Sequence, residues 1–149
     1  MRTHSRCLVA LAVATASSLS SCASPTGTDA TLALVSVRGS WSYASSDAGR
    51  ATATTGTLAL SQDSTVRFNG TLDANETDGR GQVRHIVGIV NGRTLDATLV
   101  DFDLAVDASV IRHHTGSVHG DSLTGNWVEL SDAGVSAAGT FRARRIRSP

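Results

Sequence analysis

From Leu32 onward, apolar and polar residues alternate in short runs that glycine, asparagine or aspartate interrupts. A period of two places successive side chains on opposite faces of an extended strand. The pair Asn91-Gly92 is the strongest short-range hairpin signal in the chain and predicts a tight turn. The predicted strands are Val37–Tyr43, Thr57–Ser61, Val66–Leu72, Gln82–Val90, Arg93–Leu99, Asp101–Asp107, Thr115–His119, Leu123–Glu129 and Gly139–Arg145.

These runs predict an all-β domain with eight or nine short antiparallel strands and no helix. A sheet of this kind must protect its unpaired edge strands, either by closing into a barrel or by folding into a sandwich. Because the links between strands are short, we expect a single antiparallel up-and-down β-barrel of about eight strands. A β-sandwich is the alternative.

Composition narrows the class of protein further. Hydrophobic residues make up 40% of the chain but aromatic residues only 4%, so the core must rely on Val, Leu, Ala and Ile. Thirteen cationic residues balance thirteen acidic ones, which leaves a formal net charge of zero. A neutral chain gains little from counterion release, so we expect no nucleic-acid partner.

The N-terminus carries a targeting signal. Arg2 and Arg6 precede an apolar stretch of about a dozen residues, too short to span a bilayer, which needs roughly 20. It ends in Leu19-Ser20-Ser21-Cys22, which resembles the lipobox of bacterial lipoproteins. The resemblance implies a signal peptide over residues 1–21, a lipidated Cys22 opening a tether over 22–31, and a barrel domain over 32–149. The alternative is an ordinary secretory peptide with a chance cysteine.

Lipidation would attach the protein to a membrane and remove its last thiol. Two or three acyl chains hold a protein durably, because each buried CH₂ contributes ~0.8 kcal/mol. Ala23 follows the cysteine, which resembles the outer-membrane sorting signal, so we expect the outer membrane, facing the periplasm. Cys7 lies in the signal peptide, so the mature chain would have no disulfide, thiolate nucleophile or Cys-bound metal.

A second resemblance concerns the barrel itself. Gly39-Ser40-Trp41 on the first predicted strand and the arginines of the last strand are similar to the signature of the calycins, the lipocalin and avidin superfamily. In that superfamily a cation from the final strand packs over the tryptophan at the closed end. The resemblance implies that Arg142 or Arg144 stacks on Trp41. The lipocalin Thr-Asp-Tyr motif and the biotin-binding tryptophans of avidins have no counterpart.

Histidines and carboxylates give no convincing metal or catalytic site. His113 and His114 are adjacent, so on a strand they face opposite ways and cannot share an ion. Asp73–Gly79 lacks the spacing of a calcium loop and is interpreted as a polar hairpin loop. The chain has only two glutamates, Glu76 in that loop and Glu129 on a strand, and no Gly-x-Ser-x-Gly elbow. We expect no enzyme activity, metal or cofactor.

The C-terminal run Phe141–Arg147 holds four arginines. One interpretation is contact with anionic headgroups near the anchor. The other is a last strand that places Phe141, Ala143 and Arg145 on one face and Arg142 and Arg144 on the other, followed by a basic tail.

Two functions remain for the barrel. An eight-stranded barrel can hold one small ligand, so the first is binding of a lipophilic molecule. Its cavity would be lined by Val66, Phe68, Leu72, Leu104 and Val106. The second is a filled barrel that acts as a structural or protein-interaction module of the cell envelope, through polar loops at Asp73–Arg80 and Arg112–Thr115.

Overall fold

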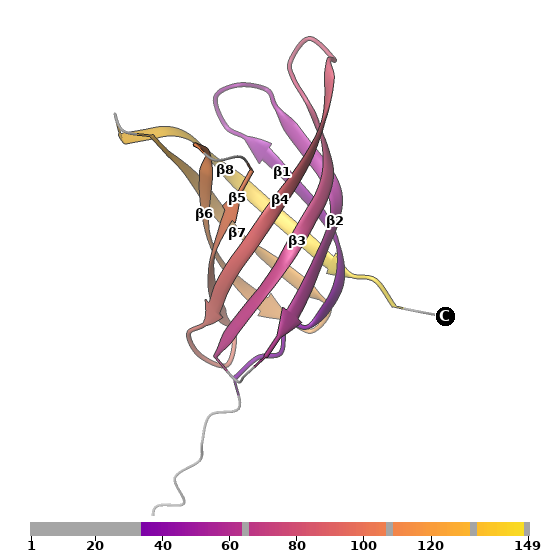
Figure 1. Cartoon of the computed structure of the whole chain (residues 1–149), viewed down its shortest axis with the longest axis vertical. Coiled ribbons are helices and arrows are strands. Elements are labelled where there is room, and N and C mark those ends of the chain that lie inside the picture. The colour runs from indigo at the N-terminus through magenta and orange to yellow at the C-terminus, as the bar shows by residue number, and fades with distance from the viewer. Residues whose placement is uncertain (1–33, 64–65, 107–108, 132–133, 148–149) are drawn as a thin grey trace, which may run out of the picture. The chain divides into compact units, whose positions relative to one another are not determined.

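The computed structural model describes residues 34–63, 66–106, 109–131 and 134–147. The predicted signal peptide, Cys22 and the predicted tether lie outside the described residues. Eight strands make up the domain (Figure 1). They are β1 (Gly39–Asp47), β2 (Ala53–Gln62), β3 (Arg67–Thr77), β4 (Val83–Thr94), β5 (Leu99–Ala105), β6 (Ile111–His119), β7 (Ser122–Ser131) and β8 (Gly134–Arg145).

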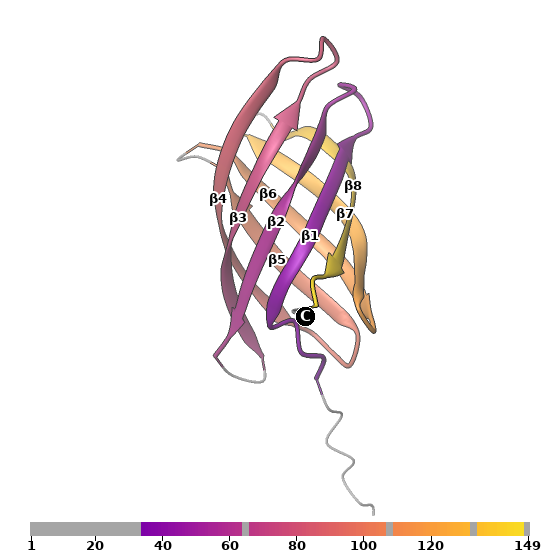
Figure 2. The ribbon, with the colours of Figure 1, turned by 90° about the vertical axis from the view of Figure 1, so that its right-hand side faces the viewer.

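Each strand pairs antiparallel with the next, and β8 pairs with β1 to close the barrel. The closing register aligns Trp41 with Arg145 and Ser45 with Phe141. This confirms the predicted up-and-down barrel and excludes the sandwich. Figure 2 shows the seam, with β1, β8 and β7 side by side. Both the ladder and the core lie within residues 37–145, so the barrel has what it needs to fold on its own.

Alternation along each strand sends one set of side chains into the barrel, where they pack against one another as a buried core. A Cβ added to Gly92 would lie 2.4 Å from the ring of Phe68, and one added to Gly88 would lie 2.5 Å from Leu104. These inward glycines therefore accommodate neighbouring side chains. The largest fully buried residues are Trp41, Leu58, Leu72, Leu104, Leu123, His114, Val37, Val90 and Val100.

The prediction of a turn at Asn91-Gly92 is wrong, because both residues lie inside β4. The chain reverses instead after Thr94, where the Asp96 carboxylate accepts hydrogen bonds from the backbone N–H groups of Thr98 and Leu99, each at 2.7 Å. No strand covers 93–99 as a unit, so the count is eight. The space that Phe68 needs explains why a glycine stands at position 92 without a turn.

Two predicted polar loops are strands. β3 continues to Thr77, so the Asp73–Arg80 loop shrinks to a turn in which Asp78 accepts hydrogen bonds from the backbone N–H groups of Arg80 and Gln82. Arg112–Thr115 lies within β6. Glu76 and Arg112 point into one end of the barrel, described below, and the residues that alternate with them face outward.

The closed end of the barrel carries a tryptophan and a cation, but the cation is not one of the two expected. Arg145 lies over Trp41, with its guanidinium carbon 4.3 Å from the ring centroid. It also donates to the backbone carbonyls of Ser36 and Arg38. Arg142 and Arg144 are exposed, because Phe141 and Ala143 occupy the inward positions of β8 and turn those two arginines outward. The indole of Trp41 donates to Val37 at 2.9 Å.

Candidate functional site

The opposite end of the barrel, which we call the mouth, has a polar interior. It is the end where β1 finishes and β2 begins, and where the β3–β4 hairpin projects beyond the other strands (Figure 1). Inward side chains at this end are charged or hydroxylated although they are buried or nearly so. They are Ser45, Thr54, Glu76, Arg112 and Glu129.

Arg112 organises the mouth by bridging two carboxylates from other strands. Its Nη2 donates to Glu76 on β3 at 2.9 Å, and its Nε donates to Glu129 on β7 at 3.1 Å. All three side chains are only 10 to 12% exposed. Burial by itself would raise the pKa of Glu76, but hydrogen bonds from Arg112 and Arg84 outweigh it and lower that pKa. Burial opposes the charge of Arg112, yet its two glutamates leave its pKa raised.

A further contact gives Glu129 a fixed orientation. Its Oε1 accepts a hydrogen bond from Ser136 at 2.9 Å, and Arg50 lies 3.6 Å away. Ser136 stands at the irregular register between β7 and β8, where Glu129 pairs with Ala137 and the next pair is Leu130 with Val135. A bulge at this position re-aims a side chain. Here it places a hydroxyl on the carboxylate.

Trp127 provides a binding group without a protein partner. The guanidinium of Arg112 lies 5.1 Å from its ring centroid, and the residue is 4% exposed. Its indole Nε1 is buried and has no hydrogen-bond partner among the described residues. A buried N–H without an acceptor costs about 1–3 kcal/mol. The indole therefore favours any acceptor that enters the mouth.

A small hollow of about 50 Å³ lies beside this indole. A space of this size holds a few water molecules or one small polar group, since one water needs roughly 10–15 Å³ on this measure. The lining includes two carboxylates, Asp47 and Glu76, and two arginines, Arg50 and Arg112, so its charges balance. Its other lining residues are Ser45, Thr52, Thr54 and Trp127.

Below the mouth, His114 and Tyr43 form a buried neutral pair. His114 Nδ1 lies 2.9 Å from the carbonyl of Arg112, which can only accept, so this nitrogen carries the proton. Nε2 is then the acceptor for the Tyr43 hydroxyl at 3.0 Å. Burial lowers the pKa of His114 to about 4 and raises the pKa of Tyr43 to about 12. The imidazole also stacks on Phe102, with ring centroids 4.5 Å apart.

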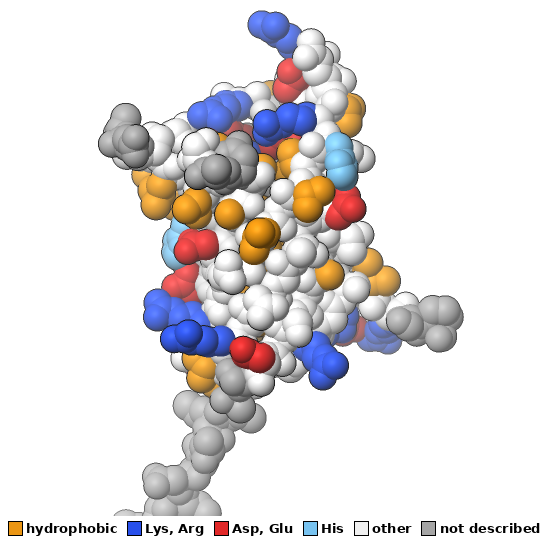
Figure 3. All heavy atoms as spheres, in the orientation of Figure 1, with side chains coloured by type: hydrophobic (Ala, Val, Ile, Leu, Met, Phe, Trp, Pro, Cys, Tyr) orange, Lys and Arg blue, Asp and Glu red, His pale blue; other side chains and the backbone are white. Residues whose placement is uncertain are grey.

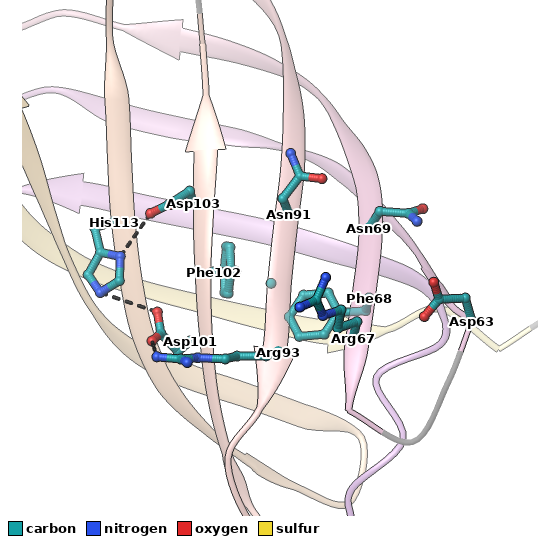
Figure 4. Close-up of a pocket in the computed structure, with 11 residues that line it drawn as sticks. Asp63, Arg67, Phe68, Asn69, Asn91, Arg93, Asp101, Phe102, Asp103 and His113 are labelled. Atoms are coloured by element: carbon teal, nitrogen blue, oxygen red, sulfur yellow. Dashed lines mark hydrogen bonds and ion pairs between the residues drawn. The ribbon is translucent and has the colours of Figure 1, made fainter.

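The outer face across β3–β6 carries a larger but open hollow of about 560 Å³ (Figure 4). Outward side chains form two cross-strand rows there: Asn69, Asn91, Asp103 and His113, and beside it Arg67, Arg93, Asp101 and Thr115. His113 lies between two carboxylates, 3.2 Å from Asp101 and 2.8 Å from Asp103. The predicted opposite orientation of His113 and His114 is confirmed. Asp101 also pairs with Arg93 at 3.1 Å, so the polar groups of this face engage one another.

A row of apolar side chains crosses the outer face nearer the mouth. Each member pairs with the next across the ladder, in the order Ile89, Ala105, Ile111, Leu130 and Val135. The four large members are 45 to 65% exposed. Figure 3 shows hydrophobic side chains gathered on this face. We call this set the apolar row.

The predicted ligand cavity is not where the sequence placed it. Leu72 and Leu104 are 0% and 2% exposed in the packed core, and Phe68 packs against Phe102. Val106 is partly buried against the same core. Val66 is 43% exposed, because it precedes β3 and lies beyond the end of the barrel interior. The hollow of the barrel lies at the mouth instead.

The sequence pattern does not identify the mouth residues, because charged stretches are typical of loops. Glu76 and Arg112 both lie in segments that the pattern predicts to be polar loops. The sequence signal that could identify them is the alternation itself. Arg112 and His114 alternate with outward residues on β6, and Trp127 and Glu129 do so on β7. Among the described residues, no group of three or more His, Cys, Asp or Glu side chains is placed to hold a metal. The described part of the chain also has no helix long and apolar enough to cross a membrane.

Comparison with known proteins identifies the fold and no family. No protein-family profile matches the sequence, and no curated protein matches it. A solved structure described as EF1p2_mFAP2b bound to DFHBI matches with a TM-score of 0.58 at 16% identity. Another, described as a de novo designed fluorescence-activating β-barrel, matches with a TM-score of 0.56 at 14% identity. Each match covers 73% of this chain and 93% of the other, and at these identities the likeness shows the barrel fold alone.

Proposed function

We propose that this protein is a lipoprotein of the cell envelope, anchored through Cys22 in the outer membrane and facing the periplasm. In this proposal its barrel binds a small ligand at the mouth and catalyses no reaction. The observation that carries the binding function is the buried indole N–H of Trp127, which lies beside a polar hollow and has no acceptor in the described part of the chain. Such a donor is stabilised when a ligand supplies the missing acceptor. The two similar structures support the small-ligand part of the proposal, because one is described as bound to DFHBI and the other as fluorescence-activating.

The lining defines the chemistry of the bound group. Its balanced charges give no net attraction for an ion, and the hollow offers hydroxyl groups beside an indole donor. We therefore assign it an uncharged polar group with a hydrogen-bond acceptor, such as a carbonyl or a hydroxyl. A lipophilic ligand held in the middle of the barrel needs volume that Leu72, Leu104 and their neighbours already fill. Only one end of a ligand enters a space of about 50 Å³.

The two tryptophans allow a direct test, because one stands at each end of the barrel. Trp127 lies in the mouth, and its indole N–H has no acceptor within the ranges that the structure describes, whereas the N–H of Trp41 donates to the Val37 carbonyl at the closed end. A ¹H–¹⁵N spectrum of the protein resolves one indole signal for each. Adding a small-molecule extract of cell envelopes should shift the Trp127 signal downfield and leave the Trp41 signal in place, and native mass spectrometry should then give the ligand's mass.

The variant Trp127→Phe keeps an aromatic ring in the cluster and removes the indole donor, together with part of the ring volume. It should lose the bound mass in native mass spectrometry while its circular dichroism remains that of the wild type. If no envelope fraction moves the Trp127 signal, or if Trp127→Phe retains the ligand fully, the mouth is not the binding site.

The membrane anchor is supported by the lipobox sequence and is tested separately. Cys22→Ser should move the protein from the membrane pellet to the soluble fraction, because the substitution removes the thiol that carries the acyl chains. A substitution within the barrel, such as Trp127→Phe, should not. Retention of Cys22→Ser in the pellet would contradict the lipoprotein assignment.

The apolar row favours a second candidate function, a protein-interaction module of the envelope. A contiguous exposed apolar surface marks an interaction site more often than scattered apolar residues do. The double change Ile89→Ser and Leu130→Ser should abolish a specific complex that chemical crosslinking detects in intact envelopes. The control is the double change Thr71→Ser on β3 and Val128→Ser on β7, outside the apolar row. It should leave that complex intact.

A further inference from the structure

Strands β7, β8 and β1 lie side by side (Figure 2), and their outer faces form a hollow of about 500 Å³ that two arginines border. Arg142 and Arg144 point outward from β8 because Phe141 and Ala143, which alternate with them, are buried. The hollow exists because the outward side chains around the arginines are short. Its other lining residues are Ser42, Ala44, Ser122, Thr124 and Ala143.

The guanidinium groups of Arg142 and Arg144 have no carboxylate partner within the described ranges. Arg145 and Arg147 differ, because both lie against Asp121. Hydrogen bonding with Arg147 lowers the pKa of Asp121, and the charges of Arg145 and Arg144 add to that effect. Since Asp121 is already engaged, Arg142 and Arg144 keep their N–H donors for an anion from outside the protein.

The hollow lies in the half of the barrel that contains the closed end. Among the described residues, this half has seven arginines and four aspartates, whereas the mouth half has four arginines and six acids. The arginines of the closed half are Arg38, Arg67, Arg93, Arg142, Arg144, Arg145 and Arg147, and its acids are Asp63, Asp96, Asp101 and Asp121. The protein is therefore polarised along the barrel axis, with its excess positive charge at the closed end.

The chain also enters the barrel at this end. Val37 precedes β1 and its backbone N–H donates to Gln62 at 3.0 Å, at the end of β2. Eleven residues separate Cys22 from Leu34, the first described residue, and n extended residues span at most about 3.6 Å × n, or roughly 40 Å here. A lipid at Cys22 therefore keeps the closed end within that distance of the membrane surface.

We propose that Arg142 and Arg144 dock the closed end of the barrel on an anionic membrane surface, with lipid phosphates held between the two guanidinium groups. Guanidinium groups bind phosphate oxygens through directed N–H donors, and the hydroxyls of Ser42, Ser122 and Thr124 line the same hollow. A basic patch beside a lipid anchor supplies a second membrane signal. The docking rests on the membrane anchoring proposed above and is independent of the ligand at the mouth.

The test uses the barrel, residues 31–149, whose closed sheet and core are complete without the anchor. It is sedimented with phosphatidylcholine vesicles that contain or lack about a third phosphatidylglycerol. We expect binding only to the anionic vesicles, and less at higher salt. Arg142→Gln and Arg144→Gln should each weaken it about fivefold, the factor that one arginine near an anionic surface contributes.

Arg80→Gln is the matched control, because it removes one exposed positive charge at the mouth end. It should bind like the wild type. If Arg80→Gln weakens binding as much as Arg142→Gln, the effect follows net charge and the docking site is wrong. Equal binding to neutral vesicles, or no binding to anionic ones, overturns the proposal. So does tighter binding of an acidic peptide that the same two variants abolish, because that result assigns the hollow to a protein partner.

These outcomes are separable from the proposed function. Failure of the docking leaves the release of Cys22→Ser and the shift of the Trp127 signal unaffected. Retention of Cys22→Ser in the pellet removes the anchor but leaves the vesicle result unchanged.

Discussion

The buried pair of His114 and Tyr43 makes the stability of the barrel sensitive to acid. His114 is 0% exposed, and burial lowers the pKa of its imidazole from 6.5 to about 4. Its Nδ1 already donates to the Arg112 carbonyl, and its Nε2 accepts from Tyr43. A second proton on Nε2 would remove the acceptor that the Tyr43 hydroxyl now uses and place a charge between aromatic rings. The folded barrel therefore resists protonation of His114.

The sign and size of the effect follow from this difference in pKa. Between pH 6.5 and about 4 the unfolded chain binds a proton on His114 that the folded chain does not, so stability falls as the pH falls. One pKa unit corresponds to 1.36 kcal/mol, so the loss from pH 7.5 to pH 4 is about 3 kcal/mol. About 1.4 kcal/mol of it has already occurred at pH 5.5. Below pH 4 both states are protonated and His114 adds no further loss.

Urea denaturation at pH 7.5, 5.5 and 4 measures this loss, with His114→Gln as the reference. Glutamine offers an acceptor to Tyr43 and does not titrate in this range. The carboxylates of the chain titrate equally in the wild type and in His114→Gln. The difference in unfolding free energy between these two proteins therefore isolates the titration of His114. We expect that difference to shrink by about 3 kcal/mol from pH 7.5 to pH 4. Parallel pH profiles for the two proteins would refute the buried neutral histidine.

Three further substitutions test the packing, each by urea denaturation at pH 7.5. Gly92→Ala should cost about 1–3 kcal/mol because its methyl group would lie 2.4 Å from the ring of Phe68, whereas Gly49→Ala, in open surroundings, should cost less than about 0.5 kcal/mol. Trp41→Ala should cost about 3–5 kcal/mol, since the indole is fully buried, and a loss of less than about 0.5 kcal/mol would contradict its place in the core. Arg112→Ala should cost about 3–5 kcal/mol because two nearly buried carboxylates lose their shared partner, and an unchanged midpoint would contradict the ion-pair geometry.

The barrel was predictable because its determinants are local. Each strand that the alternation predicted has a counterpart, except for the segment around Arg93–Leu99, and the short links pointed to an up-and-down order. The false turn at Asn91-Gly92 has a physical origin that no local pattern contains. Gly92 pairs with both Phe68 on β3 and Phe102 on β5, and it is small because aromatic rings occupy its place inside the barrel.

The candidate site was not predictable from the pattern, for a related reason. A charged residue at an inward position is tolerated only when a partner is close, and the partners of Arg112 come from 36 and 17 residues away in the sequence. Without those partners in view, polar stretches such as Asp73–Arg80 are typical of loops. The cation that stacks on Trp41 shows the same limit of prediction from the sequence pattern. The alternation places Arg145 inward and its neighbours outward, but only the register with Trp41 identifies which arginine stacks.

The two ends of the barrel constrain each other once their chemistry is considered together. The closed end has the excess of arginines and the entry of the chain, whereas the mouth has an excess of acids and a polar hollow whose own lining charges balance. A barrel docked through Arg142 and Arg144 keeps its closed end at the lipid surface and opens its mouth toward water. A ligand must then arrive from the aqueous side, and an aqueous ligand is the kind that Trp127, with an indole N–H lacking an acceptor among the described residues, is suited to bind. A lipophile would arrive from the membrane, at the end that Trp41 and Arg145 close.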